Sequence, residues 1–175
     1  MEQLLPEEIE IENNAEQLRP VSAAKRTKKT TKKTSRKYTS HKKRSSTSAS
    51  MRGKLAWPVR GKIVKKFNLS GRTPSKGIDI AASVGSPVVS AAAGKVIYSG
   101  NGISGFGHVV IIEHDNSLYT VYGYNKKLLT HSGLYVSSGQ KIALVGTHHS
   151  SGKGRFHFEV WKNKKAVNPA FYLRK

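Results

Sequence analysis

The residues of this chain whose types could do chemistry are a histidine and a carboxylate on two separate apolar segments. His157 lies in "GRFHFEV", where it alternates with Phe156 and Phe158, and Asp79 lies in "SKGIDI". Imidazole nitrogen and carboxylate oxygen both bind zinc, and a catalytic zinc site needs three protein ligands and an open position for water. The two residues therefore belong either to a complete metal site or to the remnant of one.

Two further histidines could complete such a site. His148 and His149 lie in "GTHHSSGKG", a loop that leads directly into the segment of His157. Either could supply a third ligand, or both could be solvated loop residues. His108 and His114 flank a predicted strand, where turns and sheet edges explain them without a ligand role.

Short apolar runs position these residues. Separated by Gly, Asn, Ser and Pro and lacking a long 3.6-residue periodicity, they predict an all-β fold. The segment "HDNS" predicts a tight turn, because Asp and Asn tolerate the turn backbone, and one helical turn is expected within residues 124–133. About 120 residues suffice for a compact antiparallel, sandwich-like sheet with its own core. The expected strands are 61–67, 87–100, 108–114, 118–124, 141–146 and 155–161.

Charge divides the chain into two parts. Its 175 residues hold 31 Lys and Arg against 10 Asp and Glu, a net charge of +21. Residues 1–54 begin acidic and continue as "KRTKKTTKKTSRKYTSHKKRSSTSAS", which cannot bury a core, so we expect a disordered basic arm before a domain at 55–175. The surplus charge predicts anionic polymers or lipid as partners. Specific nucleic-acid binding is not expected, because the basic run has one aromatic residue, Tyr38, and no fold to read bases.

Other sequence features bear on disulfides, membrane-spanning helices and a signal peptide. Cysteine is absent, which excludes disulfides and Cys-ligated metal. No apolar run approaches the roughly 18 residues of a transmembrane helix. The segment "MEQLLPEEIEIENNAEQL" is acidic where a signal peptide is basic and then apolar, so no signal peptide is recognisable in this chain.

Six sequence blocks follow one another in unbroken order between Trp57 and Leu173. They are "WPVRGKIVKKF", "KGIDIAASVGSPVVSAAAGKVIYSG", "GFGHVVIIEHDNSLYTVYGY", "VSSGQKIALVG", "GRFHFEV" and "VNPAFYL". Together they resemble the LytM or lysostaphin-type zinc endopeptidases of peptidoglycan. The resemblance implies the duplicated hybrid motif fold. It also implies zinc bound by a His-x-x-x-Asp motif and the last His of a His-x-His pair, with two more histidines that position water and stabilise the oxyanion.

Carried over by position, this pattern is incomplete here. The zinc ligands fall on Ser75, Asp79 and His157, and the two catalytic histidines fall on Tyr124 and Arg155. Only Asp79 and His157 keep ligand types, which is fewer than a catalytic zinc site needs. The resemblance therefore implies a vestigial metal site without a bound cofactor, or a zinc site if a loop histidine restores the third ligand.

Arg155 opposes a bound metal. Strand alternation places it on the same face as His157. Two unit charges about 4 Å apart interact by roughly 4 kcal/mol at an effective dielectric near 20, and a divalent ion doubles this repulsion. Arginine cannot deprotonate to relieve it. We expect instead that Arg155 pairs with Asp79 and replaces the lost metal charge.

The incomplete motif favours a branch of the family that resembles the murein hydrolase activators of the NlpD and EnvC kind. This resemblance implies a catalytically inactive protein of the bacterial cell envelope, expected in the periplasm, that binds and activates peptidoglycan amidases in cell-wall remodelling and daughter-cell separation. The docking groove would contain Ser75, Asp79, Tyr124, Arg155 and His157. Two alternatives stay open: an active zinc endopeptidase that cleaves peptidoglycan cross-links with a rebuilt ligand set, and a polyanion binder acting through the basic arm.

Overall fold

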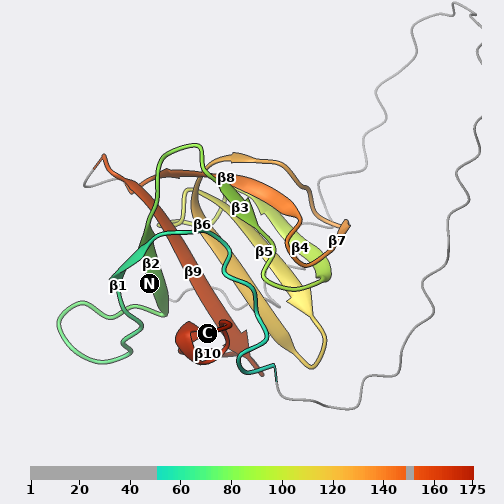
Figure 1. Cartoon of the computed structure of the whole chain (residues 1–175), viewed down its shortest axis with the longest axis horizontal. Coiled ribbons are helices and arrows are strands. Elements are labelled where there is room, and N and C mark those ends of the chain that lie inside the picture. The colour runs from blue at the N-terminus through green and yellow to red at the C-terminus, as the bar shows by residue number, and fades with distance from the viewer. Residues whose placement is uncertain (1–50, 149–151) are drawn as a thin grey trace, which may run out of the picture.

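The computed structural model describes residues 51–148 and 152–175, so the expected arm of residues 1–54 lies almost entirely outside the described residues. Within them the chain forms one antiparallel sheet, which confirms the all-β prediction (Figure 1). No helix in these ranges is long and apolar enough to span a bilayer. The elements are β1 (Lys62–Lys65), β2 (Gly77–Ala81), β3 (Pro87–Val89), β4 (Gly94–Gly100), β5 (His108–His114), β6 (Leu118–Leu128), β7 (Tyr135–Val136), β8 (Lys141–Thr147), β9 (Gly154–Lys162), β10 (Lys165–Val167) and the 3-10 helix η1 (Pro169–Phe171).

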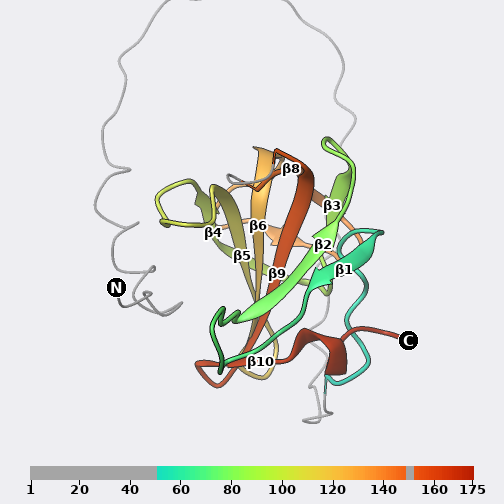
Figure 2. The ribbon, with the colours of Figure 1, turned by 90° about the vertical axis from the view of Figure 1, so that its left-hand side faces the viewer.

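Strand β9 holds the sheet together. The main path of pairing is β1-β2-β9-β8-β6-β5-β4-β7, and β9 also pairs directly with β6 and with β10. Figure 2 shows β9 between β2 and β6, with the hairpin of β5 and β6 continuing the sheet on one side. A strand paired on both sides has its backbone donors and acceptors satisfied, so side chains on β9 are held in a fixed register.

Apolar side chains cover both faces of the sheet. On β5, Val110 and Ile112 point into the larger core, which fills the space on one face. Their neighbours Val109 and Ile111 point the other way, into a smaller cluster with Trp161. This period-2 alternation on a two-sided core explains why the strand reads as a continuous apolar run in the sequence.

The predicted helical turn within residues 124–133 is wrong. Strand β6 continues to Leu128, because its second half pairs with β8 through Asn125↔Val145 and Leu128↔Ala143. The Lys-Lys-Leu-Leu stretch has favourable helix propensity, but pairing with a neighbouring strand outweighs a preference of a few tenths of a kcal/mol per residue.

Two strand predictions also need correction. The run of residues 87–100 is two strands, since β3 pairs with β8 whereas β4 pairs with β5 and β7. Strand β2 was not among the expected strands, although it carries Asp79. Gly77 makes it look weak in the sequence, but a Cβ at this position would lie 2.3 Å from the Phe158 carbonyl oxygen, so only glycine permits the close approach of β2 to β9.

The tight turn at "HDNS" is confirmed, with Asn116 and Ser117 at φ values of 63° and 52°. His114 ends β5 beside this turn, and its side chain is buried. Its Nδ1 lies 2.8 Å from the carbonyl oxygen of Ala93 and its Nε2 lies 2.6 Å from Thr120 Oγ1. Burial lowers the pKa of His114, so the imidazole is neutral at pH 7.

Candidate functional site

Strands β2 and β9 bring the two chemically distinctive residues together. Asp79 on β2 pairs with His157 on β9, and Gly123 of β6 pairs with His157 from the other side. Alternation along β9 directs one set of side chains into the larger core and the other set onto the opposite face of the sheet. The core set is Phe156, Phe158 and Val160, and the opposite set is Arg155, His157, Glu159 and Trp161.

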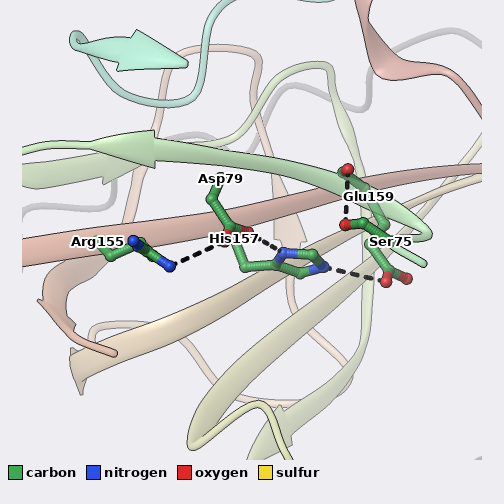
Figure 3. A network of polar contacts seen from close by, with 6 residues as sticks. Ser75, Asp79, Arg155, His157 and Glu159 are labelled. Atoms are coloured by element: carbon green, nitrogen blue, oxygen red, sulfur yellow. Dashed lines mark hydrogen bonds and ion pairs between the residues drawn. The ribbon is translucent and has the colours of Figure 1, made fainter. Parts of the chain in front are cut away.

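His157 lies between two carboxylates (Figure 3). Its Nδ1 donates to Asp79 Oδ1 at 2.6 Å, and its Nε2 donates to Glu159 Oε1 at 3.0 Å. Arg155 Nη1 lies 3.5 Å from the second oxygen of Asp79, and Trp161 Nε1 donates to the second oxygen of Glu159 at 2.7 Å. A chain of polar contacts therefore runs along one face of β9, and the predicted pairing of Arg155 with Asp79 is confirmed.

The charge of His157 follows from these contacts. Burial alone would lower its pKa, but the hydrogen bonds to Asp79 and Glu159 and their negative charges outweigh it and raise the pKa to about 9. The imidazole is therefore protonated at pH 7. In this state both nitrogens are donors, which matches the two carboxylate acceptors.

Tyr124 adopts a backbone conformation that is rare for a bulky residue. Its φ is 60°, at a bulge of β6 where Gly123 and Tyr124 interrupt the pairing with β5, and its N–H donates to the Phe106 carbonyl oxygen at 2.8 Å. Left-handed backbone at a large side chain costs roughly 1 kcal/mol or more and persists where the surrounding structure holds it. The bulge directs the Tyr124 ring onto His157, with ring centroids 5.4 Å apart.

Two aromatic rings thus cover the cation. The Phe106 and His157 rings meet edge-on, with centroids 5.5 Å apart and an interplanar angle of 62°. Burial, together with the charge of Asp79, raises the pKa of Tyr124, so its phenol stays protonated at neutral pH.

A groove of about 260 Å³ opens above this cluster. Its lining includes the buried Ser75 and Glu159 and the half-buried Lys65 and Lys76. The Ser75 hydroxyl is buried and donates to the Gly77 carbonyl oxygen at 3.0 Å. A second depression of about 390 Å³ begins on the other side of Tyr124, lined by Val84, Gly107, His108, Tyr124, Asn125, Lys126, Gly146 and Thr147. Tyr124 is common to both cavities.

The donor set, as arranged, does not fit a catalytic zinc ion. A histidine ligand must offer a deprotonated nitrogen, whereas both nitrogens of His157 donate to carboxylates. The Arg155 guanidinium stands beside Asp79, and the Ser75 hydroxyl is directed to a backbone carbonyl. Among the described residues, no group of three or more His, Cys, Asp or Glu is arranged to hold a metal ion.

The loop histidines are only partly described. The ring of His148 meets Tyr124 edge-on, with centroids 5.0 Å apart and an interplanar angle of 85°. His149 lies outside the described residues. Their role as replacement ligands stays a prediction.

Sequence reasoning missed two residues of the site. Glu159 could have been found, because it lies two positions after His157 and therefore on the same face of the strand. Phe106 carries no such signal, since it comes from the loop between β4 and β5 and reaches His157 through the fold alone.

Comparison with known proteins places this arrangement in a family. Residues 73–169, more than half of the chain, match Peptidase family M23. The chain belongs to this family. The match contains β2, β6 and β9 and all five residues of the predicted groove.

The relatives of this M23 chain include proteins named as activators. It is 40% identical over 121 residues to a lipoprotein NlpD/LppB homolog of Pseudomonas aeruginosa, covering 69% of this chain and 40% of that protein. It is 39% identical over 124 residues to the murein hydrolase activator EnvC of Escherichia coli, covering 70% of this chain and 29% of that protein. The chain thus spans less than half the length of these relatives.

A solved structure supports the fold. A zinc-containing peptidase from Vibrio cholerae superposes with a TM-score of 0.62 at 30% identity, over 68% of this chain and 40% of that one. The M23 domain therefore occurs both in proteins named as peptidases and in proteins named as activators.

Proposed function

We propose that this M23 chain is a catalytically inactive LytM-domain protein of the bacterial cell envelope that binds and activates peptidoglycan amidases. The observation that carries the proposal is the position of His157 between Asp79 and Glu159. The side chains at the two ligand-type positions are satisfied by the protein's own charges. A groove in this state can recognise a partner, whereas metal-dependent hydrolysis would require these contacts to be broken.

The groove has the properties of a docking surface. It is lined by the aromatic residues Phe106 and Tyr124 together with Lys65 and Lys76. Partly exposed aromatic side chains beside cations are enriched where proteins bind one another. The strained backbone at Tyr124 holds its ring in place before a partner arrives, which lowers the entropy lost on binding.

The relatives support both the role and the location. Proteins at about 40% identity are named murein hydrolase activators, and others are named lipoproteins. Peptidoglycan amidases act on the cell wall, so an activator of this kind works in the envelope. Anionic polymers or lipid remain expected partners of the basic arm in residues 1–54.

An amidase-activation assay tests the proposal. Dye-labelled sacculi are incubated with a peptidoglycan amidase, with the full chain, or with both. We expect dye release from the mixture well above that of the amidase, and none from the chain alone. Tyr124→Asn should reduce activation about tenfold or more, because asparagine tolerates the left-handed backbone while the ring is lost. Tyr135→Ser, at an exposed site on β7, is the matched control.

The active-enzyme alternative gives a different result. A zinc endopeptidase rebuilt with Ser75, His148 or His149 would cleave peptide cross-links without an amidase, hold about one zinc per chain and lose activity with a chelator. That outcome would overturn the proposal. Activation retained in Tyr124→Asn would instead place the docking surface elsewhere on the domain.

A further inference from the structure

Two large aromatic side chains are exposed where the first and last described segments of the chain meet. Trp57 is 41% exposed and Phe171 is 62% exposed. The segments are joined by backbone hydrogen bonds from Gly53 to Phe171, from Leu55 to Tyr172 and from Arg174 back to Leu55, all between 2.9 and 3.0 Å. Both views show the beginning of the described chain beside η1 and the C-terminus (Figures 1 and 2).

Exposed cations surround these rings. The Arg52 guanidinium lies 5.8 Å from the centre of the Phe171 ring, and Arg174 Nε donates to the Lys54 carbonyl oxygen at 3.0 Å. Residues 51–60 and 165–175 contain no acidic side chain, and the Lys- and Arg-rich run of residues 25–50 leads directly into them. We name this surface the terminal patch; its members are Arg52, Lys54, Trp57, Phe171, Arg174 and Lys175, all exposed.

The polar group of the indole is already satisfied. Trp57 Nε1 donates to the Arg174 carbonyl oxygen at 2.8 Å. Removing this side chain from water therefore leaves no unpaired donor, and only its apolar surface changes environment. A surface built for a soluble polyanion needs cations but gains little from exposed aromatic carbon. The combination fits a partner that offers both negative charge and an apolar layer.

We propose that the terminal patch docks on the surface of an anionic lipid bilayer. Trp57 and Phe171 enter the boundary between headgroups and acyl chains, where aromatic side chains concentrate. Arg52, Lys54 and Arg174 lie against the lipid phosphates, and the preceding basic run adds long-range attraction. No residue of the groove takes part, so this surface is separate from the proposed docking site for an amidase.

Tryptophan fluorescence reports on the patch directly. The chain has two tryptophans, and Trp161 is only 7% exposed, so Trp57 is the one that lipid can reach. The full chain is mixed with vesicles of equal parts phosphatidylcholine and phosphatidylglycerol, with bromine on the acyl chains as a quencher. We expect quenching of part of the emission with these vesicles and none with phosphatidylcholine alone.

Phe171→Ser separates apolar insertion from charge. It removes an exposed ring without changing the net charge, and we expect vesicle binding to weaken about tenfold, the effect of withdrawing part of one aromatic side chain from the bilayer. Tyr135→Ser, which removes a ring that is 79% exposed on β7, should leave binding unchanged.

Two outcomes would overturn the proposal. Vesicle binding without quenching of the tryptophan emission, and equally strong in the wild type and in Phe171→Ser, would mean that the basic run binds by charge alone. Equal weakening of Phe171→Ser toward vesicles and toward lipid-free polyphosphate would identify the patch as a site for soluble polyanions.

Discussion

The cationic state of His157 predicts how the stability of the domain depends on pH. The folded-state pKa is about 9 against 6.5 for an ordinary histidine. Because the folded value is the higher one, its stabilising contribution is fully present below about pH 6.5 and is lost as the pH rises through about 9. The difference corresponds to about 3 kcal/mol of unfolding free energy. Most of it should disappear between pH 6.5 and 9.5.

Urea unfolding of the full chain at several pH values measures this loss. Other groups titrate near pH 9 and above, so the wild type is compared with His157→Gln, which keeps a donor in place but cannot be protonated. The wild type should lose about 3 kcal/mol more than the variant over this window. If the unfolding free energies of the wild type and of His157→Gln changed in parallel with pH, His157 would be neutral and its contacts with Asp79 and Glu159 would not be those of a cation.

Three further predictions concern the metal, the core and the register. The triple variant Ser75→His, Tyr124→His and Arg155→His returns the family's residue types, and it should bind about one zinc per folded chain by elemental analysis. A folded, metal-free variant would mean that the groove has diverged from the family geometry. Burial lowers the pKa of His114, so the wild type should lose stability as the pH falls below about 6.5, more steeply than His114→Gln does. An equal loss of unfolding free energy in the two proteins would contradict the burial of His114 as a neutral group. Gly77→Ala should cost about 2 kcal/mol or more in urea unfolding, since its Cβ would meet the Phe158 carbonyl oxygen at 2.3 Å, and an unchanged midpoint would refute the register of β2 on β9.

The sequence predicted the fold where local chemistry is decisive. Alternating apolar runs marked most of the strands, and Asp115 and Asn116 marked a turn that the structure contains. It failed where pairing with a distant strand overrides local preference. Strand β6 extends to Leu128 only because β8 lies beside it, and β2 forms despite Gly77 because β9 approaches closely.

The site was predictable to the extent that it depends on strand alternation. His157 and Arg155 share a face of β9, and this placed Arg155 beside Asp79 correctly. The position of Asp79 opposite His157 depends on register between segments 78 residues apart, which period-2 patterns do not encode. The backbone bulge that turns Tyr124 onto His157, and the loop that brings Phe106, are likewise set by tertiary packing.

The pairing of β2 with β9 has a consequence for how the domain forms. Both the floor of the groove and the junction of Leu55 with Leu173 join opposite ends of the domain. Contacts between such distant segments close large loops and form slowly, so the domain cannot complete its sheet until β9 and the segment of Leu173 have been synthesised. A nascent chain lacking β9 has neither the groove nor the central strand, and it stays without the native fold until its C-terminal segment arrives.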